Sequence, residues 1–92
     1  MFFKPMFESV GGTNYSACNA SISTTSATQH SPSLIRSQAA AGVADVYLGT
    51  CVRFLTISSD ATSVYGVVDA TYTVSAGRIN ASSSQFVVIR IG

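Results

Sequence analysis

The feature that most constrains the fold is the density of β-branched and aromatic residues in the second half of the chain. Residues 43–92 are rich in Val, Ile, Tyr and Phe, which suit the pleated, half-buried surface of a sheet. Between 63 and 75 one parity is occupied by Val64, Val68, Ala70, Tyr72 and Val74, and the other includes Asp69, Thr71 and Thr73. This alternation predicts a strand with one face on a core, and the composition around it predicts a mainly β fold.

Three strands are predicted in this half, over residues 44–57, 63–75 and 85–91. A turn cluster at 58–62 and a longer loop at 75–84 separate them. The first strand has apolar residues on both parities, and Gly49 is a candidate bulge or twist point within it. Because sequential strands with short connections usually pair antiparallel, we expect a C-terminal three-strand meander. The whole chain is then expected to form a small antiparallel β-sandwich or barrel-like sheet.

One segment of the first half predicts a helix instead of a strand. Ser31 is a suitable cap, Pro32 stands in the first turn and Gly42 follows the end, which is the usual order of helix start and stop signals. We therefore expect one short helix over residues 32–41. Residues 19–28 alternate weakly and predict a single Thr-rich strand.

The chain is poor in charge for a protein that would stand alone in water. Only 5 Lys and Arg and 4 Asp and Glu are present, so 10% of the residues are charged, against about 25% in ordinary soluble domains. Hydroxyl residues take their place, with 15 Ser and 9 Thr. Since solubility usually depends on surface charge, we expect neighbouring subunits to cover part of this surface. The net charge of +1 gives no electrostatic reason to bind nucleic acid or anionic lipid.

Large apolar side chains crowd the first seven residues, among them Phe2, Phe3, Met6 and Phe7. They predict an extended N-terminal arm over residues 1–12 that docks on a neighbour, followed by a single β-rich domain over 13–92. Tyr47 and Leu55 lie on the second apolar parity of the 44–57 strand and complete the set of predicted partner contacts.

Neither a signal peptide nor a membrane span is expected. Lys4 follows two Phe residues, and Pro5 and Glu8 interrupt the apolar stretch that a signal peptide needs. The long uncharged stretch between Glu8 and Arg36 contains too many Ser, Thr, Asn, Gln and Gly residues to lie in hydrocarbon.

Residues suited to catalysis or metal binding are few. His30 is the only histidine, and no nucleophile-elbow pattern accompanies it, so we expect an exposed loop position. The cysteines, Cys18 and Cys51, are predicted to be reduced and buried, with a disulfide between them as the alternative. No metal-ligand spacing or phosphate-binding glycine motif is present. No two acidic residues are near in sequence: they are Glu8, Asp45, Asp60 and Asp69. We predict no enzyme, no metal and no cofactor.

A single-stranded nucleic-acid-binding module is one alternative function. Three arginines and five aromatic residues could form a cationic stacking platform: Arg53, Arg78 and Arg90 with Tyr47, Phe54, Tyr65, Tyr72 and Phe86. Aromatic residues at alternating strand positions are more often in the core. Three arginines without lysines nearby also make a poor contact surface for the phosphate backbone of a nucleic acid. Nucleic acid is therefore not the expected partner.

In size, in its hydroxyl-rich and charge-poor composition, and in the apolar segment 1–7, the chain resembles small β-rich structural proteins of bacteriophage virions, especially capsid decoration (cement) proteins. The resemblance lies in overall character and includes no diagnostic motif. It implies a protein on the capsid surface, present as a trimer or dimer, that bridges major capsid proteins or other virion subunits through many weak contacts. The main alternative is a fibre-like, pilus-like or adhesive β-module that neighbouring subunits complete by strand addition.

Overall fold

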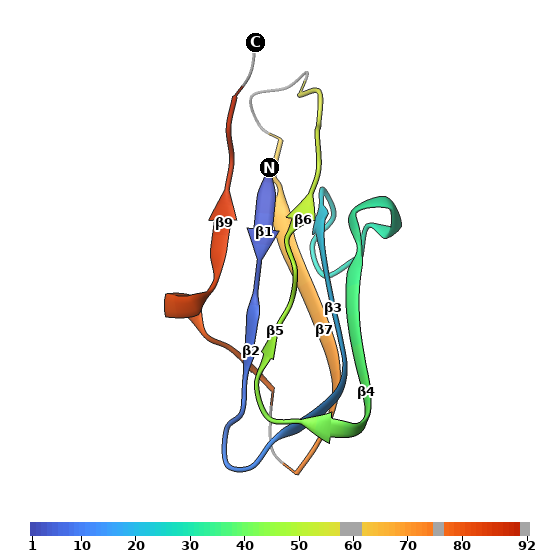
Figure 1. Cartoon of the computed structure of the whole chain (residues 1–92). Helices are drawn as coiled ribbons and strands as arrows, with labels where there is room; N and C mark the ends of the chain where they lie inside the picture. Colours follow the sequence, from blue (N-terminus) through green and yellow to red (C-terminus); the bar gives the residue numbers. More distant parts are fainter. Residues whose placement is uncertain (58–61, 75–76, 91–92) are drawn as a thin grey trace.

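The computed structural model describes residues 1–57, 62–74 and 77–90. Within them the regular structure is entirely strand or 3-10 turn, without an α-helix, and no sheet closes into a barrel (Figure 1). The strands form three antiparallel sheets of three strands each. The prediction of a mainly β, antiparallel fold is therefore confirmed, and the barrel-like alternative is wrong.

Three stretches of the chain each contribute one strand to the first sheet and one strand to the second. In the first sheet β1 lies between β6 and β9, and in the second β2 lies between β5 and β8. Their bounds are β1 Phe2–Lys4, β2 Met6–Glu8, β5 Val46–Tyr47, β6 Cys51–Val52, β8 Arg78–Ile79 and β9 Gln85–Val87. Pro5 separates β1 from β2 because it has no backbone N–H for the ladder. The next N–H, of Met6, donates to the Ser84 hydroxyl at 2.9 Å, so the break leaves this donor satisfied.

The third sheet contains the long strands. β3, Asn14–Ser23, lies between β4, Ile35–Val43, and β7, Tyr65–Thr73. A register shift between Tyr15 and Ala17 marks a bulge in β3. Tyr15 before the bulge and Cys18, Ala20 and Ile22 beyond it are all buried. The bulge thus keeps the apolar side chains of both halves of β3 on the core.

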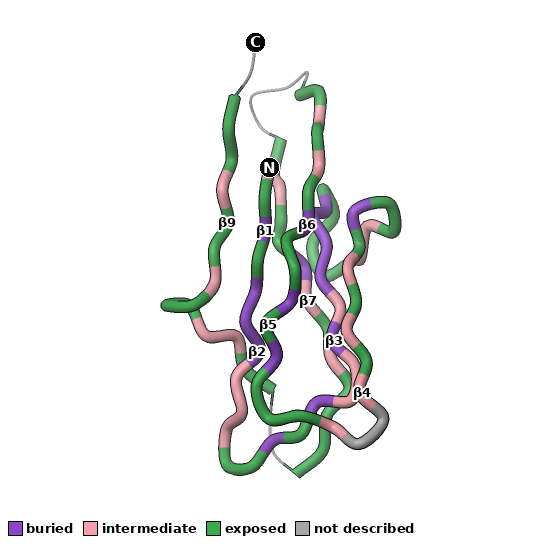
Figure 2. Tube along the Cα trace, in the orientation of Figure 1, coloured by how far each residue is buried: buried purple, intermediate pink, exposed green. Residues whose placement is uncertain are grey.

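The core lies between the third sheet and the two short ones. Figure 2 shows buried positions on β2, on β3 and where the chain runs from β5 to β6. The main cluster consists of Phe3, Phe7, Tyr15, Cys18, Ala20, Ile22, Val46, Leu48 and Cys51. Residues from the first eight positions are therefore part of the same core as the long strands.

The predicted helix over 32–41 is wrong. Ser31–Ser33 forms one 3-10 turn with Pro32 in its first positions, and the chain then continues as β4. Helix propensity is a weak prior, and after Ile35 this segment has no apolar stripe that a helix could bury. Pairing with β3 supplies hydrogen bonds to the same residues instead. Gly42, expected to end a helix, has a φ of +76° inside β4, close to where the register with β3 shifts.

The predicted C-terminal meander is also wrong. The 63–75 strand is present as β7, but the 44–57 strand is reduced to β5 and β6, broken around Gly49. The 85–91 strand forms only β9, and the expected 75–84 loop contains β8 and a 3-10 turn at Ala81–Ser83. No two strands of the second half that the structure describes pair with each other. Each pairs with β1, β2 or β3 instead.

Segment 1–12 does not form an arm apart from the domain. Its strands β1 and β2 are the central strands of two sheets, so most of their large apolar side chains face the core. The Thr-rich strand expected over 19–28 corresponds to the end of β3, which stops at Ser23. The turn expected at 58–62 lies largely outside the described residues.

Gly66 provides a test of how closely the sheets approach. A Cβ at Gly66 would lie 2.9 Å from the Phe3 ring, whereas a Cβ at Gly49 would meet no atom within 4 Å. We expect Gly66→Ala to lower the free energy of unfolding by about 1–3 kcal/mol, because the ring must shift within a packed core. Gly49→Ala is the matched control and should change it by less than about 0.5 kcal/mol. Urea unfolding of both variants measures the difference, and equal values would contradict this packing.

Candidate interaction surface

The predicted contact residues divide between the core and the surface. Phe3, Met6 and Phe7 are only 8%, 4% and 3% exposed, so their side chains already pack within the chain. Leu55 is half-buried. Phe2 and Tyr47 are exposed, Tyr47 to 67%. Of the predicted set, Phe2 and Tyr47 are thus the exposed members.

The register of β1 determines which side chains face outward. Phe3 faces the core together with its partner Cys51 on β6, and its partner Phe86 on β9 packs against the Phe3 ring, with centroids 5.4 Å apart, while it stays partly exposed. Successive residues of a strand point to opposite faces, and paired residues share a face. Phe2, the residue before Phe3, therefore points away from the core. Its pairing partners Val52 and Val87 point the same way. Phe2 and Val52 are exposed and Val87 is half-buried.

The same outward row continues beyond the strands. Arg53 turns inward, because its Nη1 donates to the Ile22 carbonyl oxygen at 2.8 Å. The next side chain, Phe54, lies on the opposite side and is 77% exposed. Ile89, two residues beyond Val87, is also exposed. We call this row the outer apolar face: Phe2, Val52, Phe54, Val87 and Ile89.

Tyr47 extends the apolar surface on the neighbouring sheet. It pairs with Met6, and the next pair, Phe7 with Val46, is buried in the core. Tyr47 therefore points outward, on the side opposite to Phe7. The sequence identified Phe2 and Tyr47 but not the rest of the outer apolar face, because the segments that carry those residues are apolar on both parities. Only the register with β1 assigns their faces.

His30 and Ser33 are close together but serve the loop between β3 and β4. The His30 Nδ1 lies 2.8 Å from the Ser33 hydroxyl, which also bonds the backbone of β3. The Asp69 carboxylate is occupied elsewhere: it accepts from the amides of Asn19 at 2.6 Å and Gln29 at 2.9 Å. The serine, histidine and carboxylate therefore do not form a relay, and their bonds fasten this loop to the sheet.

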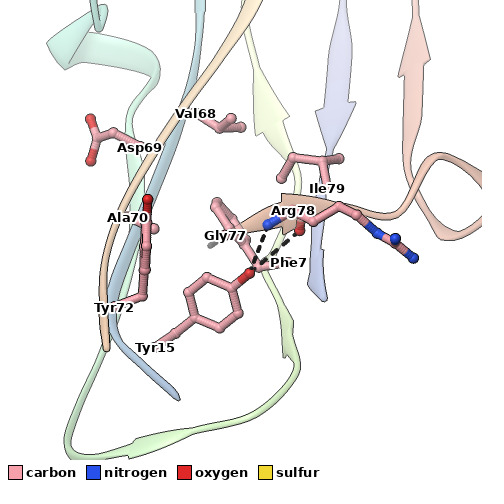
Figure 3. A pocket seen from close by; sticks show the side chains of 9 residues that line it. All are labelled: Phe7, Tyr15, Val68, Asp69, Ala70, Tyr72, Gly77, Arg78 and Ile79. Atoms are coloured by element: carbon pink, nitrogen blue, oxygen red, sulfur yellow. Dashed lines mark hydrogen bonds between the residues drawn. The ribbon is translucent and has the colours of Figure 1, made fainter. Parts of the chain in front are cut away.

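A small hollow lies beside Tyr15, between β2, β7 and β8 (Figure 3). Its volume is about 160 Å³, below the roughly 300–1,000 Å³ of typical ligand pockets. The Tyr15 hydroxyl donates to the Glu8 carbonyl oxygen at 2.6 Å and accepts from the Arg78 N–H at 3.0 Å. The Tyr15 ring contacts Phe7 and Tyr72 edge-on, with centroids 5.7 and 6.1 Å apart. This polar group is thus satisfied by backbone and joins β2 to β8.

The arginines of the nucleic-acid alternative are partly engaged within the chain. Arg53 is bound to the Ile22 carbonyl oxygen, and Arg78 contacts the Glu8 carboxylate through Nη2 at 2.7 Å and Nε at 2.8 Å. The five aromatic residues, which we expected in the core, are instead exposed. Tyr47, Tyr65, Tyr72 and Phe86 are spread over all three sheets, so these residues do not form one stacking platform.

Over residues 1–57, 62–74 and 77–90, no three His, Cys, Asp or Glu side chains gather where they could hold a metal ion. Asp60, one of the acidic residues considered above, lies outside the described residues. Cys18 and Cys51 are free and buried, as the main interpretation predicts. Burial, with a smaller contribution from the Asp69 charge, raises the pKa of the Cys18 thiol to about 11. Burial also raises the pKa of Cys51.

In the part of the chain that the structure describes, no helix has the length and hydropathy to cross a membrane. Comparison of the chain with protein-family models, with characterised proteins and with solved structures finds no match.

Proposed function

We propose that this protein is a structural subunit of a virion, a decoration (cement) protein that binds the capsid surface and bridges major capsid proteins. In this proposal the two layers act as a small antiparallel β-sandwich that presents its outer apolar face to the shell. The observation that carries the proposal is this uncharged row of exposed side chains, with Phe2 at its centre and Phe54 exposed to 77%.

Burial of such a row explains why the protein would bind. Removing apolar surface from water stabilises a contact by about 25 cal/mol per Å², and aromatic side chains commonly anchor interfaces. Contiguous exposed apolar patches on small proteins commonly mark interaction sites. The scarcity of charge agrees with this reading, since charged residues are depleted at the centres of interfaces.

The direct test is the composition of particles. Virions from the source of this sequence are purified by density gradient and analysed by quantitative mass spectrometry. We expect the 9.6 kDa chain in a fixed ratio to the major capsid protein. Particles that lack it would overturn the proposal, and recovery in filaments instead would favour the second candidate below.

Two matched valine variants test the face. Val52 lies on the outer apolar face, and Val43 is similarly exposed at the end of β4 in the third sheet. We expect Val52→Asp to weaken binding to stripped particles at least about tenfold, because a charge would be buried without a partner. Val43→Asp should bind as the unmodified protein does. Occupancy is measured by co-sedimentation, and equal loss in both variants would contradict a role for this face.

The second candidate is a fibre-like or pilus-like module completed by neighbouring subunits. The observation that favours it is that β6 and β9, the outer strands of the first sheet, pair only with β1 in the part of the chain that the structure describes. A strand from another molecule could extend such a sheet by backbone pairing.

A further inference from the structure

One edge of β7 has no strand beside it in the part of the chain that the structure describes, because β7 pairs only with β3. The orientation of Ile22 in β3 shows which backbone groups of β7 point to that edge. The Ile22 N–H donates to the hydroxyl of Ser33, just before β4, at 3.1 Å, and its carbonyl oxygen accepts from Arg53. Both groups therefore point away from β7, so Gly66, the pairing partner of Ile22, points its own N–H and carbonyl oxygen away from β3.

This orientation recurs at every second residue of β7. From Ile22 to Cys18 the register between β3 and β7 does not shift, so Val68 and Ala70 point their backbone groups outward as Gly66 does. Over residues 1–57, 62–74 and 77–90, no hydrogen bond is made to these outward groups. We call the outward backbone groups of Gly66, Val68 and Ala70 the free edge.

The charge on β7 is turned away from the free edge. Asp69 is its charged residue, and the carboxylate accepts from Asn19 of β3 at 2.6 Å and from Gln29 at 2.9 Å. Gln29 is itself bonded to Ser21 of β3, so both partners hold the carboxylate on the β3 side. β7 also lacks the lysine and proline that commonly protect edge strands, whereas the opposite edge strand β4 carries the exposed Arg36.

The hollow beside Tyr15 adjoins the free edge, because the side chains of Val68 and Ala70 line it together with Ile79 of β8 (Figure 3). Its other walls are also largely apolar, and the charged ends of Asp69 and Arg78 point away from it in Figure 3. A cavity of about 150 Å³ can hold a benzene molecule. The hollow, at about 160 Å³, therefore has the size for one large apolar side chain.

A strand on the free edge would reach this hollow. In an antiparallel pair, the residues that exchange hydrogen bonds with Val68 or Ala70 have side chains on the same face as these two residues. That face packs against the core and includes the hollow. The backbone groups and the hollow therefore specify the same ligand, an extended peptide with apolar side chains at alternate positions.

We propose that the free edge binds an extended, uncharged peptide segment of a partner protein, and that one large aliphatic side chain of this segment fills the hollow. Backbone hydrogen bonds would provide affinity and the hollow would select the side chain, as in other complexes formed by strand addition. The site goes beyond the proposed function, because it lies on the third sheet and not on the outer apolar face. Since the contact is much smaller than a standard interface, we expect a dissociation constant of about 10–100 μM.

A synthetic peptide tests backbone pairing and the hollow separately. The probe is acetyl-Ser-Thr-Val-Thr-Leu-Thr-Val-Thr-Ser-amide, which has one apolar face as a strand, and calorimetry measures its binding. N-methylation of its Leu removes an N–H directed at the free edge and should weaken binding at least about tenfold, whereas N-methylation of the next Thr should weaken it no more than about threefold. Replacing the Leu by Asp should also weaken binding at least about tenfold, because a charge would enter the hollow.

Two proline variants of the protein are the matched pair. Ala70→Pro removes an N–H of the free edge. Cys18 has the orientation of Ile22 and pairs with Ser37, so the next residue of β4, Gln38, points its N–H away from β3, and Gln38→Pro removes that group. Edge strands accept proline where the N–H faces solvent, and circular dichroism checks the fold of both variants. We expect peptide binding at least about tenfold weaker for Ala70→Pro and unchanged for Gln38→Pro; the N-methylated peptides give the same test without altering the protein.

Hydrogen exchange followed by NMR locates the bound peptide. The amides of Gly66, Val68 and Ala70 should exchange more slowly when the peptide is present, because they become hydrogen-bonded. The Arg36 amide lies one residue before Ser37 and points outward on β4, so its exchange should not change.

The outcomes separate this inference from the proposed function. Absence of binding at about 1 mM peptide would overturn the inference. So would equal weakening by the two N-methylated peptides, equal slowing of exchange on β4 and β7, or a dimer of the chain that excludes the peptide from the free edge. In each of these cases particle binding that depends on Val52 would leave the proposed function standing. Absence of the chain from particles, with the peptide bound as expected, would overturn the proposed function alone.

Discussion

Phe7→Ala is expected to lower the free energy of unfolding by about 3–5 kcal/mol, the usual cost of removing a buried phenylalanine. The Phe7 side chain is 3% exposed and packs edge-on against Tyr15. For a chain of this length total stability is roughly 5–14 kcal/mol, so this loss is a large share of it. Chemical denaturation followed by circular dichroism measures the change.

Phe54→Ala is the control for this variant, because it removes the same side chain from a position that is 77% exposed. Its effect on the monomer should stay within about 0.5 kcal/mol. If segment 1–12 were a docking arm, Phe7→Ala would be as harmless as Phe54→Ala. A similar small change in both would therefore contradict the central position of β2.

Cys18 should react with a thiol reagent at pH 8 at least about 1,000 times more slowly in the folded protein than in urea. The thiolate is the reactive form, and burial both restricts access and raises the pKa of Cys18 to about 11. Reaction then depends on the small fraction of molecules that unfold, which is about 10⁻³ or less for stable proteins. Mass spectrometry of alkylated peptides measures the rate for Cys18 and Cys51 separately. Fast labelling of Cys18 without unfolding would contradict the buried position.

The raised pKa of Cys18 also gives stability a pH dependence. The folded thiol holds its proton more tightly than the unfolded thiol, whose ordinary pKa is 9.0. The contribution of this proton to the free energy of unfolding is complete below pH 9 and is lost as the pH rises toward 11. Cys18→Ala removes this contribution, so its stability should fall less steeply over that window. Identical slopes would show that Cys18 does not titrate differently in the two states.

The strand content was predictable wherever a segment alternates cleanly. From Val68 to Val74 apolar and polar side chains alternate, and β7 forms over Tyr65–Thr73. Which strands pair with each other was not predictable in the same way. Alternation indicates which face of a strand is buried, but it does not indicate which other strand lies beside it. The helix prediction failed at 32–41 because its start and stop signals are local, whereas the β4–β3 ladder that forms there joins residues far apart in sequence.

The candidate surface was predicted in part for a related reason. Phe2 and Tyr47 were predicted as contact residues because of their large aromatic side chains, and both are exposed. Phe3 and Phe7 belong to the same short sequence but face inward, since side chains alternate along β1 and β2. No local pattern separates Phe2 from Phe3. The distinction appears only when the register with β6 and β9 is known.

The position of β1 and β2 has a consequence for biosynthesis. These strands leave the ribosome before the strands that pair with them, since β5, β6, β8 and β9 begin at residues 46, 51, 78 and 85. Until those residues emerge, Phe3 and Phe7 have no strand beside them and remain open to chaperones or to other nascent chains. Such distant pairing favours folding in milliseconds to seconds rather than microseconds. Chains made side by side on one messenger could therefore meet while their sheets are still incomplete.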